Sequence, residues 1–108
     1  MTNRPELIAQ ARVYIPGGVN SPVRAFNGVG GDPVIFERSQ GACLYDVSGR
    51  SYIDYIGSWG PMIAGHSNPA IIAAVQDAVN RGLSFGAPSA AEVTMAKRLC
   101  ELIDGMDM

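Results

Sequence analysis

Residues 15 to 26 place a serine and an arginine in a loop that glycine and proline make stiff. Ser21 lies three residues before Arg24 in the run Ile-Pro-Gly-Gly-Val-Asn-Ser-Pro-Val-Arg-Ala-Phe. A guanidinium fork beside a short hydroxyl suits a small carboxylate ligand, because the fork can donate two parallel hydrogen bonds. An ordinary structural turn with a solvated arginine uses the same residue types. The loop therefore predicts either a carboxylate site or a turn.

Trp59 is the only tryptophan, and it lies in a second special loop, the glycine- and proline-containing run from Gly57 to Pro61. A large aromatic side chain in such a loop can anchor a ligand or cover a neighbouring core. The composition of the loop leaves both interpretations open.

Four further polar residues could do chemistry but fit structural roles better. His66, the only histidine, precedes a helix entrance without a Ser-His-Asp or Cys-His spacing. Asp46 and Asp54 lie on adjacent expected strands, where paired carboxylates can act as acid and base, but solubility of a strand edge explains them better. Lys97, the only lysine, lies on the polar side of an expected helix, whereas an imine-forming lysine needs a desolvated pocket. We therefore expect no imine chemistry from this chain alone.

The elements that must position these residues form an α+β pattern. A capping box of Asn3 and Glu6 predicts an N-terminal helix that ends before Pro16. Alternating apolar residues predict a three-stranded antiparallel meander, with strands at 34–38, 42–47 and 51–56. Two more helices are predicted, at 69–81 behind an Asn68 cap and at about 90–104 behind a capping box of Ser89 and Glu92.

Each predicted helix has an apolar stripe, and we expect that of the third helix to be buried. The stripes are Leu7, Ala11, Tyr14 and Ile15; Ile71, Ile72, Val75, Ala78 and Val79; and Val93, Ala96, Leu99, Cys100 and Ile103. We expect one continuous segment over 1–108, made of a helix and candidate substrate loop (1–33), the meander (34–56), and a loop with two helices (57–108). Since an apolar segment could begin at residue 106, the chain resembles the opening of a longer protein.

The composition excludes several classes of function. The chain has 108 residues, a net charge of −2 and 47% hydrophobic residues, which is typical of a soluble globular protein. It has no basic run for nucleic acid and no apolar run near the roughly 20 residues that a membrane span needs. Cys43 and Cys100 form no C-x-x-C pair, which predicts reduced, buried thiols in a cytoplasmic protein. One histidine argues against a metal site, and Gly28 to Gly31 lack the lysine of a phosphate loop.

Four runs, in order along essentially the whole chain, resemble the glutamate-1-semialdehyde 2,1-aminomutase family, a relative of the class III aminotransferases with the fold-type I pyridoxal-phosphate architecture. They are IPGGVNSPVRAF at 15–26, YDVSGRSYIDYIGSWGP at 45–61, GHSNPAI at 65–71 and RGLSFGAP at 81–88. The meander and the helix entrance at 65–69 are shared widely with class III aminotransferases. The Ser-Pro-Val-Arg and Gly-Ser-Trp-Gly-Pro runs are more specific to the aminomutases.

The resemblance implies an isomerase of tetrapyrrole (porphyrin) biosynthesis, which shifts an amino group within glutamate-1-semialdehyde to give 5-aminolevulinate. It also implies pyridoxal or pyridoxamine 5'-phosphate as cofactor and a cytoplasmic homodimer. In this family Arg24, with Ser21, would hold the substrate carboxylate, and Trp59 would wall the substrate pocket.

The family's cofactor lysine, Ser-Gly-Thr phosphate loop and pyridine-pairing aspartate match no position here. The resemblance thus implies an N-terminal segment, without catalytic or cofactor-binding residues of its own, that is inactive alone and leads towards a large domain. Ser48, where the family more often has Asp, and Asp104-Gly105, in place of Pro-Ser, depart from the family at surface turns.

Two alternatives stay open. The chain could be a segment of a plain class III aminotransferase. It could also be a non-catalytic interaction module that pairs with a separately encoded remainder, since its helices would leave apolar faces exposed.

Overall fold

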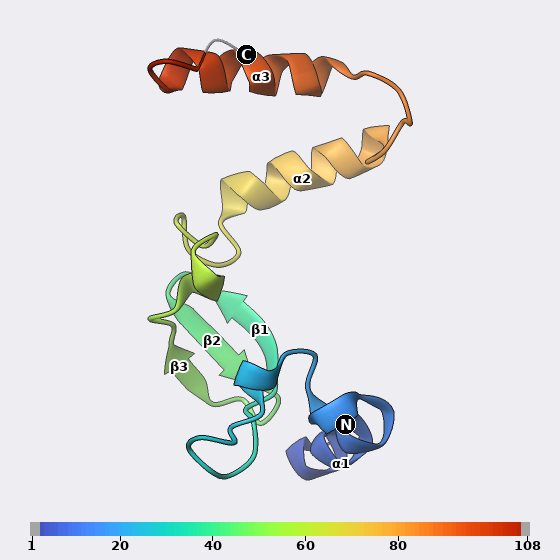
Figure 1. Ribbon diagram of the computed structural model, residues 1–108, viewed down its shortest axis with the longest axis vertical. Coiled ribbons are helices and arrows are strands. Elements are labelled where there is room, and N and C mark those ends of the chain that lie inside the picture. The colour runs from blue at the N-terminus through green and yellow to red at the C-terminus, as the bar shows by residue number, and fades with distance from the viewer. Residues whose placement is uncertain (1–2, 107–108) are drawn as a thin grey trace. The chain divides into compact units, whose positions relative to one another are not determined.

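The computed structural model describes residues 3–106 and divides into two compact units, one ending at Ile71 and the other beginning at Ile72. The first unit holds one helix and a three-stranded antiparallel sheet of order β1-β2-β3 (Figure 1). Its elements are α1 (Arg4–Tyr14), β1 (Phe36–Gln40), β2 (Cys43–Asp46) and β3 (Ser51–Ile53). The predicted α+β pattern and meander are confirmed, although the strands are offset from, or shorter than, the predicted ranges.

Helix α1 begins with the predicted capping box. Glu6 N donates to Asn3 Oδ1 over 3.1 Å, and Asn3 N donates to Glu6 Oε2 over 3.3 Å. Of the predicted apolar stripe, Leu7 and Ala11 are half-buried, whereas Tyr14 is 82% exposed and the buried residue is Ile8, outside the stripe. The face that carries Ile8 is covered, because the arginines one turn before and one turn after Ile8 bind the chain that leads to β1. Those bonds run from the guanidiniums of Arg4 and Arg12 to Asp32 and Pro33.

The sheet contains one irregularity, which explains its imperfect alternation. Phe36 pairs with Asp46 but Arg38 pairs with Tyr45, so one extra residue, Glu37, interrupts the register as a β-bulge does. Beyond this point the Arg38 guanidinium lies over the Tyr45 ring, 3.5 Å from its centre. A strand that carries a bulge cannot keep strict two-residue periodicity, so a sequence pattern misplaces its ends.

The predicted second and third helices are confirmed as α2 (Pro69–Arg81) and α3 (Ala90–Leu102). Asn68 Oδ1 accepts from Ala70 N over 3.0 Å, and the Ser89 capping box is present, but α3 ends earlier than predicted. The predicted burial of the α3 stripe is wrong, and the apolar face of α2 is also uncovered. Neither helix has a buried residue. An amphipathic helix buries its stripe only where another element covers it. Exposed stripe residues are Ile71, Ile72, Val75, Val79, Val93, Leu99 and Ile103.

Both cysteines are free and half-buried, where the sequence predicted buried thiols. Cys43 lies on β2 and Cys100 on α3. Their redox state in a cell stays a prediction.

Candidate substrate pocket

The first unit contains a pocket of about 1130 Å³, and two of the three residues predicted to bind substrate line it. Arg24 reaches it from the Gly-Pro loop (residues 15–26), and Trp59 reaches it from the segment that follows β3. Apolar side chains make up much of the remaining wall, among them Ile8, Val23, Phe26, Ile35, Phe36 and Ile56. The fold therefore brings Arg24 and Trp59 to a single hollow, which a second arginine, Arg12, also lines.

Arg24 is held by contacts within its own loop. It ends a short 3-10 turn, Pro22–Arg24, and its backbone N–H donates to the Ser21 carbonyl over 3.0 Å. The Arg24 Nη1 atom donates to Asn20 Oδ1 over 2.7 Å. A guanidinium has five N–H donors, so the bond to Asn20 leaves most of the fork available to a carboxylate.

Ser21, the third predicted site residue, is half-buried and lies outside the residues that line the pocket. It precedes the 3-10 turn with an extended backbone, and its side chain makes no capping hydrogen bond there. Its visible role is to supply the carbonyl that starts the Arg24 turn. Contact of the Ser21 hydroxyl with substrate stays a prediction.

Trp59 stands on a strained backbone corner. Both Ser58, with φ 54°, and Trp59, with φ 68°, occupy the left-handed region, which costs a residue with a Cβ about 1–2 kcal/mol. The Trp59 side chain is 72% exposed, so burial of the indole does not offset this cost. Other contacts must hold the corner.

Asp54 and His66 supply those contacts at the two ends of the segment. Asp54 Oδ1 accepts from Ile56 N over 2.9 Å and from Gly57 N over 3.0 Å. The His66 Nε2 atom lies 2.6 Å from Asp54 Oδ2, and the two side chains are 9% and 6% exposed. The hydrogen bond from His66, then those from Ile56 and Gly57, lower the pKa of Asp54 below its usual range. Because an ionised carboxylate only accepts, His66 Nε2 carries the hydrogen.

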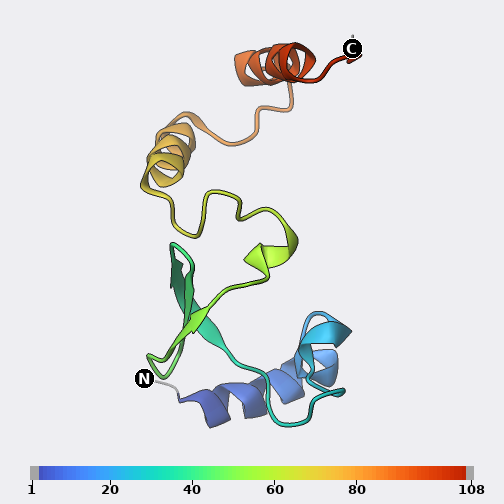
Figure 2. The same ribbon diagram turned by 90° about the vertical axis from the view of Figure 1, so that its left-hand side faces the viewer.

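The two ends of this segment also bond to two neighbouring residues of the β1–β2 turn. Asp54 N donates to the Ala42 carbonyl over 2.8 Å, and Gly41 and His66 exchange backbone hydrogen bonds of 2.8 and 2.9 Å. Figure 2 shows the chain leaving the sheet after β3 and returning before α2. Residues 54–66, the Trp59 segment from here on, therefore form a loop closed at its base.

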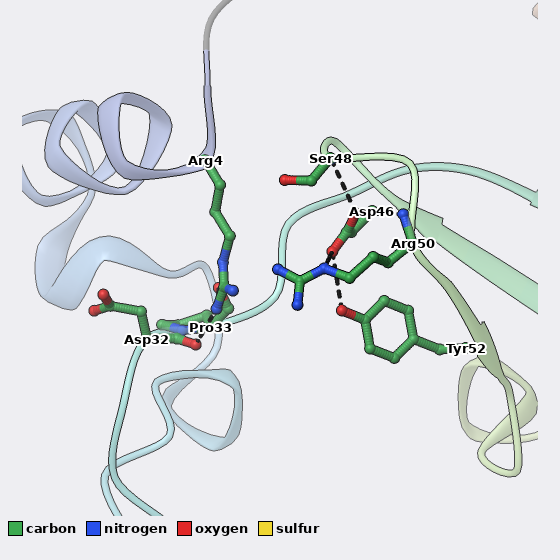
Figure 3. Close-up of polar contacts among 7 residues, drawn as sticks. All are labelled: Arg4, Asp32, Pro33, Asp46, Ser48, Arg50 and Tyr52. Carbon is green, nitrogen blue, oxygen red and sulfur yellow. Dashed lines mark hydrogen bonds and ion pairs between the residues drawn. The ribbon is translucent and has the colours of Figure 1, made fainter.

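Asp46 performs the corresponding task in the β2–β3 turn (Figure 3). Its side chain accepts from Ser48 N and Arg50 N, each over 2.9 Å, and from the Tyr52 hydroxyl over 2.9 Å. Burial raises the pKa of Asp46, but the hydrogen bonds from Arg50, Tyr52 and Ser48 outweigh it, so the pKa falls below its usual value. The bond to Asp46 in turn raises the pKa of Tyr52.

The sequence interpretation of the two aspartates was therefore wrong. Asp46 is 1% exposed and the Asp54 side chain is 6% exposed, so neither serves mainly for solubility at a strand edge. Each carboxylate is bonded to a separate set of donors, which also removes the alternative of a paired catalytic site. The structural interpretation of His66 agrees with its position in the base of the Trp59 segment.

Sequence reasoning missed the Asp54–His66 pair and the Asn20 contact to Arg24. A partial signal was present, because Asp54 stands three residues before Gly57, as in turns that an aspartate side chain closes. The long-range bond to His66 has no comparable local signature.

Lys97 is exposed on α3, as predicted, with Nζ 3.7 Å from Glu101 Oε1. The lining of the described pocket contains arginines but no lysine. The imine-forming lysine that a pyridoxal phosphate needs is therefore not among the residues that line this pocket. Within residues 3–106 no three His, Cys, Asp or Glu side chains gather as a metal site would require. In the same range no helix is both long and apolar enough to cross a bilayer.

A profile described as Aminotransferase class-III matches residues 26–107, about three quarters of the sequence. The chain belongs to the class-III aminotransferase family. The match covers the meander, the Trp59 segment and the whole of α2 and α3.

Solved structures agree with this membership. A transaminase with PLP bound is 35% identical with a TM-score of 0.75, over 86% of this chain and 21% of its own. An omega-transaminase from Sphaerobacter thermophilus is 29% identical with a TM-score of 0.79, over 90% of this chain and 22% of its own. A glutamate-1-semialdehyde aminomutase from Pseudomonas aeruginosa in complex with PMP shares the fold at 20% identity and TM-score 0.76, over 90% and 21%. This class-III aminotransferase chain thus spans about a fifth of the length of these structures.

Proposed function

We propose that this chain is the N-terminal segment of an aminomutase that converts glutamate-1-semialdehyde to 5-aminolevulinate in tetrapyrrole biosynthesis. One observation carries the proposal: Arg24 and Trp59 come from the two aminomutase-like runs and line the same pocket. A substrate with one free carboxylate and a short carbon chain matches the Arg24 cation beside a largely apolar wall, the second lining arginine, Arg12, being paired with Asp32.

In this proposal Arg24 binds the substrate carboxylate and Trp59 excludes water from the carbon chain. An aminomutase must retain its diamino intermediate until the second amino transfer, and fixing the carboxylate keeps the intermediate oriented. The intact protein would use pyridoxal or pyridoxamine phosphate, which supplies the electron sink for moving an amino group. Its lysine would come from outside this chain, so we expect the chain alone to be inactive.

A class III transaminase that moves the amino group between two molecules is the second candidate. It is favoured by the 35% and 29% identities to transaminases, against 20% to the aminomutase. Both candidates need the same cofactor, so substrate use must separate them.

Single-turnover and steady-state assays of the full-length protein loaded with pyridoxamine phosphate test the proposal. An aminomutase forms 5-aminolevulinate from glutamate-1-semialdehyde without any added amino donor or keto acid. A transaminase loaded with pyridoxamine phosphate can aminate at most one equivalent of the aldehyde, and it turns over continuously only when an amino donor is also supplied. Product formation that depends on a second substrate would overturn the aminomutase proposal in favour of the transaminase.

A further inference from the structure

The Trp59 segment is the only part of the described pocket wall whose two ends are joined by a buried side-chain pair. Within the pair, Asp54 lines the pocket together with Trp59, whereas His66 does not. Both oxygens of the Asp54 carboxylate are already bonded within the segment, to Ile56 N, Gly57 N and His66. An effect of His66 on the pocket therefore passes through its bond to Asp54 and through the backbone between residues 54 and 66.

A continuous series of hydrogen bonds provides that path. Asp54 Oδ1 fixes the N–H groups of Ile56 and Gly57. The carbonyls of these two residues then accept from Trp59 N, over 3.2 Å, and from Gly60 N, over 3.1 Å. The left-handed corner at Ser58 and Trp59 is therefore bracketed by the turn that Asp54 closes.

The return path leads back to the same carboxylate. Met62 N donates to the Gly57 carbonyl over 3.2 Å, and Gly65 N donates to the Met62 carbonyl over 3.0 Å. His66 follows at once and bonds to Asp54 Oδ2. Removing the His66 end opens the ring of bonds and leaves a buried, ionised carboxylate with one oxygen unsatisfied.

From this closed ring we propose that Asp54 and His66 are positioning residues for Trp59, which fix the indole against the pocket and thereby set the affinity for substrate. The inference deepens the proposed function, on which its kinetic part rests. The pair makes no contact with the reacting atoms in this proposal. It acts by preventing the strained corner at Ser58 and Trp59 from relaxing.

The first experiment measures the order of the Trp59 side chain in the full chain, which has a single tryptophan and thus a single indole N–H signal. The signal is assigned by its loss in Trp59→Phe. Rigid groups have order parameters near about 0.85 and flexible ones below about 0.6. We expect the native indole to be near the rigid value and His66→Leu to move it below the flexible limit, because leucine cannot donate to Asp54.

Two variants make this result specific. His66→Gln keeps an N–H donor at nearly the position of Nε2 and should restore most of the order. Asp46→Asn alters the other buried carboxylate, which has a similar set of donors but belongs to a turn that does not carry Trp59. It should leave the Trp59 signal unchanged. Loss of order in Asp46→Asn equal to that in His66→Leu would show a general loss of folding and overturn the proposal, as would a rigid indole in His66→Leu.

The second experiment compares kinetic constants in the full-length enzyme. Misplacement of a pocket wall that contacts the substrate throughout the reaction should raise KM while leaving kcat nearly unchanged. We expect KM to rise about tenfold in His66→Leu and less than about threefold in His66→Gln. Equal KM values in His66→Leu and native enzyme would overturn the proposal. If the native protein does not turn over glutamate-1-semialdehyde, the proposed function fails while the indole measurement still decides the positioning role.

Discussion

The two loops that line the pocket are stabilised in opposite ways. The Gly-Pro loop around Arg24 is closed by bonds between residues at most four apart, and its one side-chain bond, from Arg24 to Asn20, is exposed. The Trp59 segment is closed by a buried pair twelve residues apart and is bonded at both ends to the β1–β2 turn. The aromatic wall of the pocket is thus set by the sheet, while the cation can adjust locally to its ligand.

The largest effect should follow loss of the cation itself. Arg24→Ala in the full-length enzyme removes the charged partner of the substrate carboxylate. Because a hydrogen bond to a charged group is worth about 1.5–3 kcal/mol, kcat/KM should fall about 10- to 100-fold. Arg24→Lys should recover only part of it, because an ammonium lacks the planar fork. Arg98→Ala, which removes an exposed arginine on α3, is the matched control. Unchanged turnover in Arg24→Ala would remove the basis for assigning the carboxylate to this loop.

Next in size is the aromatic wall. Trp59→Ala exposes the substrate chain to water and should lower kcat/KM about tenfold, whereas Trp59→Phe, which keeps an aromatic face, should lower it about two- to threefold. Steady-state kinetics of the two variants give the comparison. If both variants behaved like the native enzyme, Trp59 would merely cover a neighbouring surface, the alternative that composition left open.

A smaller change should follow loss of the contact that orients Arg24. Asn20→Ala removes one exposed hydrogen bond, worth about 0.5–1.5 kcal/mol, so KM should rise about threefold while kcat stays the same. Asn20→Asp keeps an acceptor but adds a charge that competes with the substrate carboxylate, and it should bind substrate less well than Asn20→Ala. A decrease in KM for Asn20→Asp would contradict the interpretation that Asn20 orients Arg24 for the substrate carboxylate.

The smallest effect near neutral pH should be that of acid on thermal stability, to which the Trp59 segment contributes through Asp54. The folded-state pKa values of Asp46 and Asp54 are lowered, so their contribution to stability is complete above the unfolded value near about 3.9 and is lost as pH falls through the folded values. Thermal unfolding of the full chain should therefore show a constant Tm from about pH 7 to 5 and a decline below about pH 4. Asp54→Asn should flatten the part of that decline due to Asp54. A decline of the same steepness in both proteins would show that Asp54 is not tied as described.

The parts of the fold that the sequence predicted depend on near neighbours. The capping boxes at Asn3 and Ser89 need only a carboxylate three residues later, so a local pattern contains all the information. The faces of the helices depend on what covers them, and α1 turns its Arg4–Ile8–Arg12 face to the chain because of residues 32–33. No local pattern contains that contact.

The candidate site divides in the same way. Nothing in the spacing of Arg24 and Trp59 indicates a shared pocket, and their association was predicted only through the family resemblance. Asp54 and His66 were assigned separately, because their bond forms only after the chain has passed through the Trp59 corner. Asp46 was misjudged because a carboxylate on a short strand is more often solvated than bonded to three donors.

The crossing of Gly41 and Gly65 limits how this region can be redesigned. A Cβ on Gly65 would lie 3.2 Å from the Gly41 carbonyl oxygen, and both glycines have positive φ. A substitution at Gly65 would meet both this close approach and the positive φ, whereas one at Gly41, where a Cβ has no neighbour within 4 Å, would meet the positive φ alone. Ile63 lies within the Trp59 segment, between Asp54 and His66, and is 95% exposed, so a new side chain there meets no such close approach. Directed evolution of substrate range should therefore diversify the outer part of this segment and leave its glycine crossing unchanged.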